Sequence, residues 1–134
     1  LYIMDKQTIL AGFNNHFVEF MEDIKRAFPN NKDIYVTYHA LHTIRKANPS
    51  LICKIWKKAI LQYYRDAIEQ GDLHFFATKD YSSDFPSSMS GVVRKLDNFR
   101  RPLANLNESD KQKVIQYLQN LTKLNDLYFS NSSV

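Results

Sequence analysis

The stretch from Phe13 to Asp33 constrains the fold more than any other part of this sequence. Large apolar residues recur around it at steps of three and four, which is the spacing of one face of an α-helix. The stripe comprises Leu10, Phe13, Phe17, Phe20, Met21, Ile24 and Phe28. Asp5 is suited to cap the start of this helix, and Pro29 is expected to end it. The pattern predicts a long helix that covers a core with one face.

Two more helices are expected to follow this one. The first is predicted from Asp33 to Lys46, although its opening run Ile-Tyr-Val-Thr-Tyr also suits a strand. Asn48 and Pro49 are expected to cap and begin the next helix, which should run to about Gln70 with Gly71 as its C-terminal cap. Its predicted inner face comprises Ile52, Ile55, Trp56, Ala59, Tyr63 and Ala67.

The second half of the chain predicts two helices and one loop. A docked aromatic turn is expected at Leu73 to Phe76, followed by a mobile, serine-rich loop over residues 77–91. A short helix over Val92 to Phe99 and a long one from Asn107 onward, capped with the help of Asp110, should follow. The 134 residues are therefore predicted to form one all-α domain, a bundle of four to five antiparallel helices, with a disordered tail at 130–134.

The number of aromatic residues points to contacts with other proteins. Nine Phe, eight Tyr and one Trp represent more apolar surface than the core of so small a domain is expected to use. The candidates for a protein interface are the rings of the loop region, Phe75, Phe76, Tyr81 and Phe85. The alternative is that these rings fold back and close the end of the bundle.

The basic residues suggest a second kind of partner. The chain carries 18 Lys and Arg against 14 Asp and Glu, a net charge of +4, which favours anionic neighbours. Two groups of candidates for binding phosphates are Lys54, Lys57, Lys58 and Arg65, and Arg94, Lys95, Arg100 and Arg101. The alternative is a solvated helix face, because Asp66 and Asp97 lie among these residues.

The patterns that could support catalysis or metal binding are weak. His39 and His42 share a helix face, as do His16 and Glu19, but neither pair has the further ligands that a metal site needs. The single cysteine, Cys53, cannot form an intramolecular disulfide and is expected to be a buried thiol in a reducing compartment. We find no phosphate-binding glycine loop and no paired carboxylates, so we expect a protein that is not an enzyme and has no cofactor.

A resemblance adds a biological setting. The segments FNNHFVEFMEDIKRAFPNNKDI, NPSLICKIWKKAI and YYRDAIEQGDLHFFATKDY resemble small uncharacterised proteins of nucleocytoplasmic large DNA viruses that infect algae and amoebae. The resemblance covers about Phe13 to Tyr81 and implies a virion protein, such as a minor capsid component, with no functional residues assigned.

The leading hypothesis is accordingly a non-enzymatic structural protein of the virion that contacts neighbouring protein subunits. No apolar run approaches the roughly 20 residues of a membrane span, so no membrane span is expected. A nucleic-acid-associated accessory protein that uses the basic residues is the alternative. A metal-dependent enzyme built on His16, Glu19, His39 and His42 is the weakest of the three hypotheses. Neither the partner's identity nor the oligomeric state follows from these patterns.

Overall fold

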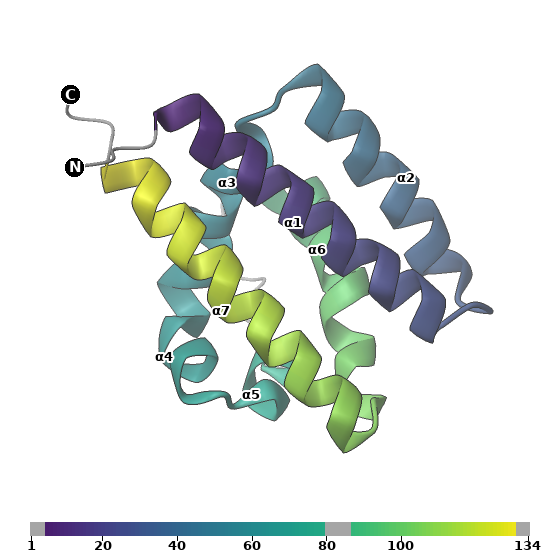
Figure 1. The fold of residues 1–134 in the computed structure, drawn as a ribbon. Coiled ribbons are helices and arrows are strands. Elements are labelled where there is room, and N and C mark those ends of the chain that lie inside the picture. Colours follow the sequence, from purple (N-terminus) through teal and green to yellow (C-terminus); the bar gives the residue numbers. More distant parts are fainter. Residues whose placement is uncertain (1–4, 80–86, 131–134) are drawn as a thin grey trace.

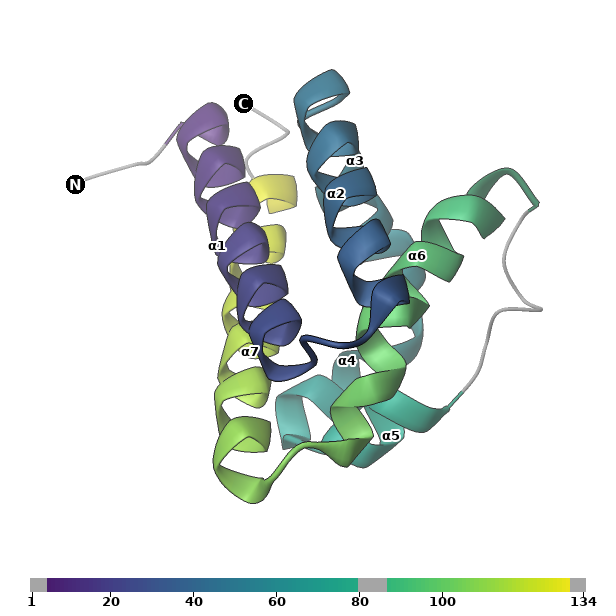
Figure 2. The same ribbon diagram turned by 90° about the vertical axis from the view of Figure 1, so that its right-hand side faces the viewer.

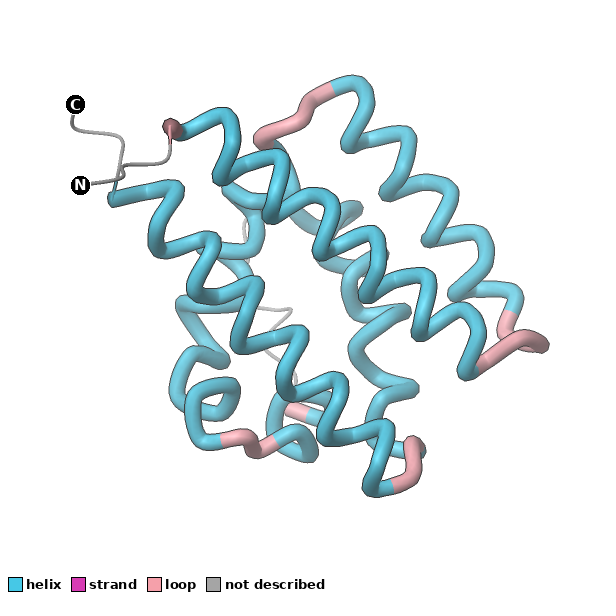
Figure 3. Tube along the Cα trace, in the orientation of Figure 1, coloured by secondary structure: helices cyan, strands magenta, loops and turns pink. Residues whose placement is uncertain are grey.

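The computed structural model describes residues 5–79 and 87–130, and every regular element in these ranges is a helix (Figure 1). The three long helices are α1 (Lys6–Ala27), α2 (Lys32–Ala47) and α7 (Glu108–Ser130). The shorter ones are α3 (Leu51–Ile55), α4 (Gln62–Gln70), α5 (Leu73–Thr78) and α6 (Ser90–Arg100). A π-helix, Trp56–Leu61, joins α3 to α4, and 3-10 helices at Ser87–Met89 and Arg101–Asn105 flank α6. The predicted all-helical bundle is confirmed (Figure 3).

The longest helices, α1 and α7, lie side by side. The Lys6 ammonium lies 4.6 Å from the centre of the Tyr128 ring, and further along the pair the Tyr117 hydroxyl donates to Asp23 Oδ2 at 2.6 Å. The start of α1 therefore lies against the end of α7 (Figure 1). On its other side α1 packs against α2, which also contacts α6 (Figure 2). Among the described helices, none has both the length and the apolar character that a bilayer span requires.

The apolar stripe of α1 forms one wall of the core, as predicted. Phe13, Phe17 and Trp56 meet with ring centroids 6.1 to 6.2 Å apart, so α1 packs directly on the π-helix. The stripe residues Leu10, Phe13, Phe17, Phe20, Met21 and Ile24 are all buried, and Phe28 is half-buried. Packing of these side chains holds α1 in place.

The predicted helix ends are mostly confirmed. Asp5 accepts the backbone N–H of Thr8 at 2.8 Å, and Asn107 accepts that of Asp110 at 2.8 Å. Gly71 ends α4 in the left-handed conformation, with φ of 73°. Each of these contacts satisfies groups that a helix end leaves unpaired.

The predicted start at Asn48 is wrong. Asn48 instead ends α2, because its N–H donates to Ile44 O at 2.8 Å, and α3 begins at Leu51. Pro49 lies in the turn between the two helices, where its carbonyl oxygen accepts a hydrogen bond from Asn14 Nδ2 at 2.8 Å. This link to α1 explains why the helix begins two residues later than the proline suggested.

The predicted inner face of this helix needs a correction at Tyr63. Tyr64 is the buried tyrosine, whereas Tyr63 is half-buried. In a regular α-helix, at about 100° per residue, Tyr63 would lie only about 20° from the face of Ile52. The π-helix at Trp56–Leu61 accommodates one extra residue. Tyr64 therefore takes the place on the inner face that Tyr63 would have in a regular α-helix.

The structure has helices at both ends of the segment 77–91 that was predicted to be a mobile loop. Ala77 is buried in α5, and Thr78 ends that helix, with its hydroxyl donating to His74 O at 2.7 Å. The segment at Leu73 to Phe76, predicted as a turn, belongs to the same helix, and residues 87–91 are helical. Residues 80–86 lie outside the described ranges, as does the predicted tail beyond Ser130.

Candidate functional site

The predicted aromatic interface is largely internal where the structure describes it. Phe76 is only 4% exposed, and its ring lies 5.4 Å from that of Tyr64 in an edge-on arrangement. Phe75 is half-buried, 6.3 Å from the same Tyr64 ring. These two rings close the end of the bundle, which was the alternative reading. Tyr81 and Phe85 lie outside the described residues.

Arg100, predicted on an exposed basic face, lies in the core and is 3% exposed. Its Nη1 donates to the carbonyl oxygens of Phe76 at 2.5 Å and Lys79 at 2.8 Å, and its Nε donates to Asp97 at 3.0 Å. The guanidinium also lies 5.0 Å from the centre of the Tyr64 ring. Arg100 therefore fixes α5 against α6 and is not available to a phosphate.

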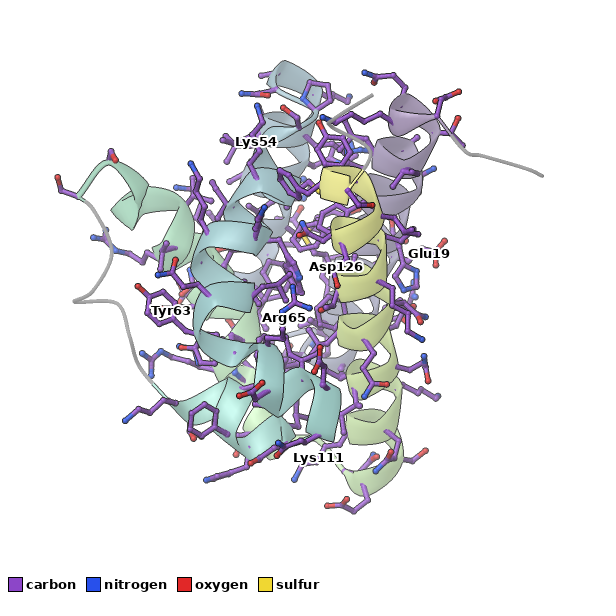
Figure 4. All side chains as sticks on the ribbon, turned by 90° about the vertical axis from the view of Figure 1, so that its left-hand side faces the viewer. Glu19, Lys54, Tyr63, Arg65, Lys111 and Asp126 are labelled. Atoms are coloured by element: carbon purple, nitrogen blue, oxygen red, sulfur yellow. The ribbon has the colours of Figure 1, made fainter. Side chains whose placement is uncertain are left out.

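Arg65 is on the surface but already holds two carboxylates. It donates to Asp126 through two bonds of 3.0 and 2.8 Å and to Glu69 at 3.4 Å (Figure 4). The hydrogen bonds that Arg65 donates to Asp126 raise the pKa of Arg65 above its usual range. This residue joins α4 to α7, so its charge is neutralised locally.

The other basic candidates are on the surface or close to it. Lys54, Lys57 and Lys58 are exposed, and the Lys57 ammonium lies 4.3 Å from the centre of the Phe129 ring. On α6 and just after it, Arg94 and Arg101 are exposed and Lys95 is half-buried. The two predicted basic groups therefore retain six of their eight members after Arg65 and Arg100 are set aside.

The three histidines considered as metal ligands, His16, His39 and His42, pack against aromatic rings. His39 is exposed, with its ring 4.6 Å from Tyr35, whereas His42 is half-buried and stacks on Tyr38 at 6.2 Å. His16 Nδ1 lies 3.9 Å from Glu19 Oε2, and its ring lies 4.8 Å from that of Tyr117. Within residues 5–79 and 87–130, no three His, Cys, Asp or Glu side chains converge in an arrangement that could hold a metal ion.

Cys53 is a buried free thiol, as predicted. Asn125, also buried, donates from Nδ2 to the Cys53 carbonyl oxygen at 2.7 Å and to its sulfur at 3.2 Å. Burial raises the pKa of the Cys53 thiol to about 11. A neutral, covered thiol is a poor nucleophile, so Cys53 has a packing role.

A groove between the end of α1 and the start of α7 was not predicted. It has a volume of about 330 Å³, and its apolar floor includes Phe20 and Val114. At its edge Tyr117 donates to Asp23, and desolvation together with that carboxylate raises the pKa of Tyr117 to about 12. The rim also carries Arg26 and Lys113, so acids and bases alternate around it with no single sign of charge.

The outer face of α2 exposes apolar residues that were not predicted from the sequence to form a binding surface. Ile34, Thr37 and Leu41 point inward and are buried. On the opposite side Tyr35 is 57% exposed and Val36 is 65% exposed, with exposed His39 one turn further on. The only other exposed large hydrophobic residue in the described ranges is Leu127, on α7. We call Tyr35, Val36 and His39 the α2 face.

The α2 face lies on the first half of α2, a helix that contacts α1 and α6. Residues 34–44 contain no Asp, Glu, Lys or Arg. The Lys25 ammonium lies 4.1 Å from the centre of the Tyr38 ring, and the Tyr38 hydroxyl donates to Glu22 at 3.2 Å. Thr37 accepts a hydrogen bond from Asn98 Nδ2 at 3.0 Å, which ties α2 to α6. The signal in the sequence was the apolar run Ile-Tyr-Val-Thr-Tyr, which exceeds what one buried helix stripe requires.

Comparison of the chain with protein-family models, with curated proteins and with solved structures finds no match.

Proposed function

We propose that this chain is a non-enzymatic interaction protein that contacts a neighbouring protein subunit through the α2 face. The observation that carries the proposal is the exposure of Tyr35 beside Val36 on a helix whose other side is buried. Among the Phe, Tyr and Trp side chains of the described residues, Tyr35 is the one that is exposed, and the others are buried or half-buried.

The chemistry of the α2 face suits a protein partner. Aromatic side chains are enriched at the centres of protein interfaces, and charged residues are depleted there. A tyrosine offers a large apolar area with a polar end, and it loses little conformational freedom on binding. Because Ile34, Thr37 and Leu41 anchor α2 from below, the face is presented on a rigid element.

We further propose that the neighbouring subunit belongs to the virion of a large DNA virus, where this chain acts as a minor capsid or other virion component. The support for this setting is the sequence resemblance over Phe13 to Tyr81. Tyr81 and Phe85 stay in the proposal as additional contacts from residues 80–86.

The test is retention of variants in particles purified from infected cells. The double variant Tyr35→Ser with Val36→Ser should lower retention at least about tenfold, because two central interface residues are lost. The matched control is Gln112→Ser with Gln116→Ser, two exposed positions on α7. Equal retention of both variants would refute the α2 face as the contact, whereas absence of the wild-type protein from particles would refute the virion setting alone.

A further inference from the structure

The positive charge of this chain is concentrated in one stretch. Residues 34–65 contain six of the 18 Lys and Arg residues and none of the 14 Asp and Glu residues. The stretch covers most of α2, all of α3, the π-helix and the start of α4. The rest of the chain has more acidic than basic residues, so the net positive charge comes from this part of the fold.

Three lysines of this stretch form a compact exposed group. Lys54, Lys57 and Lys58 lie on one side of α3 and the π-helix, and we call them the lysine ridge. Ile55, Trp56 and Ala59, their neighbours along the helix, are buried in the core, so the three lysines face outward. Figure 4 shows Lys54 on α3, level with the last turns of α7.

The lysine ridge is not neutralised by the part of the chain that the structure describes. Within residues 5–79 and 87–130, none of the three lysines forms an ion pair. Two carboxylates on helices beside the ridge, Glu69 of α4 and Asp126 of α7, are held by Arg65. Lys57 is positioned by its contact with Phe129, which carries no charge.

We propose that the lysine ridge binds the phosphate backbone of nucleic acid without reading its sequence. Lysine ammonium groups bind phosphates as point charges, and they release condensed counterions when they do so. The ridge carries no Arg, Asn or Gln, the side chains that most often recognise base edges in two bonds. The ridge is therefore expected to bind single strands and duplexes of any sequence through their phosphates.

Two other anionic partners fit the ridge less well. A membrane surface would require apolar side chains beside the lysines to enter the lipid, and the apolar neighbours Ile55 and Trp56 are buried. An acidic protein would have to bury lysines in its contact, although lysine is depleted in the centres of protein interfaces. This inference is independent of the α2 face, which contains no Lys or Arg.

The experiment measures binding of a fluorescent 20-nucleotide single strand and the matching duplex to the full chain by anisotropy over a salt series. Three phosphate contacts predict a slope of about −3 for log K against log salt concentration on the duplex. The variant K54Q/K57Q/K58Q should lose at least about tenfold in affinity at low salt. The variant K54R/K57R/K58R should retain binding, because charge and not geometry carries the contact.

The matched control is K32Q/K113Q/K123Q, which removes the same charge from three other exposed positions. It should change affinity by no more than about twofold to threefold. No binding by the wild type at low salt would overturn the proposal, as would equal losses in the two glutamine variants. Binding to vesicles rich in phosphatidylserine, or to polyglutamate, with no binding to either nucleic acid, would overturn it in favour of those partners.

Discussion

The guanidinium of Arg100 donates from Nη1 to the carbonyl oxygen of Phe76 at 2.5 Å, across 24 residues of sequence. A second bond goes to the carbonyl oxygen of Lys79, the residue after α5. Together the two bonds hold the end of α5, the helix that carries Phe75 and Phe76, two of the four aromatic residues of the predicted interface. The same contact explains two outcomes at once: Arg100 is absent from the basic surface, and Phe76 is absent from the aromatic one.

Because Arg100 is buried, replacing it should destabilise the protein without changing the protein surface. The variant Arg100→Met removes the bonds to Phe76 and Lys79 and leaves Asp97 without its partner, for an expected loss of about 3 kcal/mol in the free energy of unfolding. Arg94→Met, an exposed change on the same helix, should shift it by less than about 0.5 kcal/mol. Urea denaturation measures both, and equal values would contradict the role assigned to Arg100.

Cys53 should be unreactive in the folded protein. Its thiol is buried and its pKa is raised to about 11, so at pH 8 almost no thiolate is exposed to reagent. Iodoacetamide should label Cys53 at the rate at which the protein opens, and labelling should become fast in denaturant. Native labelling at the rate of a free cysteine would show that the contact with Asn125 does not protect the sulfur.

The raised pKa of Cys53 also predicts a direction for stability against pH. The pKa of the folded thiol is raised to about 11, so the folded state keeps its proton up to about that pH, whereas the unfolded thiol loses its proton near the ordinary pKa of 9.0. The folded state therefore binds more protons in this range, and the free energy of unfolding should fall as pH rises from about 9 to 11. Cys53→Ala should weaken this dependence, and an unchanged slope would assign it to other groups.

The π-helix predicts an unusual tolerance to deletion. Removing Lys58 would turn Trp56–Leu61 toward a regular α-helix and, at about 100° per residue, leave Ile52 and Tyr64 about 20° apart on one face. Deleting Gln116 from the regular helix α7 would rotate half of its buried face away from the core. Circular dichroism during heating should show cooperative unfolding for the first deletion and its loss for the second. Loss of cooperative unfolding on deletion of Lys58, with cooperative unfolding kept on deletion of Gln116, would contradict the proposed role of the π-helix.

Two glycines should respond oppositely to alanine. Gly71 has φ of 73°, a conformation that costs an L-residue about 1 kcal/mol or more, so Gly71→Ala should destabilise the fold. Gly91 lies within α6 and an added Cβ would meet nothing within 4 Å, so Gly91→Ala should stabilise it by about 0.5–1 kcal/mol. Thermal melts of the two variants should move in opposite directions, and a shift in the same direction would contradict this assignment.

Helical periodicity in the sequence predicted the elements whose packing repeats regularly. The stripe of α1, the caps at Asp5 and Asn107, and Gly71 each depend on local spacing or local backbone conformation, so each could be recognised from neighbouring residues. The π-helix could not, because an extra residue leaves no mark in composition and shifts the buried face only from Tyr63 to Tyr64.

Long-range contacts account for the errors at the candidate surfaces. The sequence placed Arg100 among other basic residues, but its partners Phe76 and Lys79 come from a segment more than 20 residues away. In the same way, α2 has only three buried residues because α1 and α6 cover one narrow side of it. The exposure of Tyr35 and Val36 follows from that arrangement. The apolar run Ile-Tyr-Val-Thr-Tyr shows only that α2 has more apolar residues than one buried stripe requires, and not which of them stay exposed.

The most direct test of the proposed interaction is photo-crosslinking from the α2 face in the native assembly. Benzoylphenylalanine would replace Val36 in one preparation and Gln112, an exposed residue of α7, in another. If the α2 face binds a neighbouring subunit, position 36 should give a discrete crosslinked product with that subunit and position 112 should give none. No product from position 36, or the same products from both positions, would contradict the claim that this face is where the protein binds.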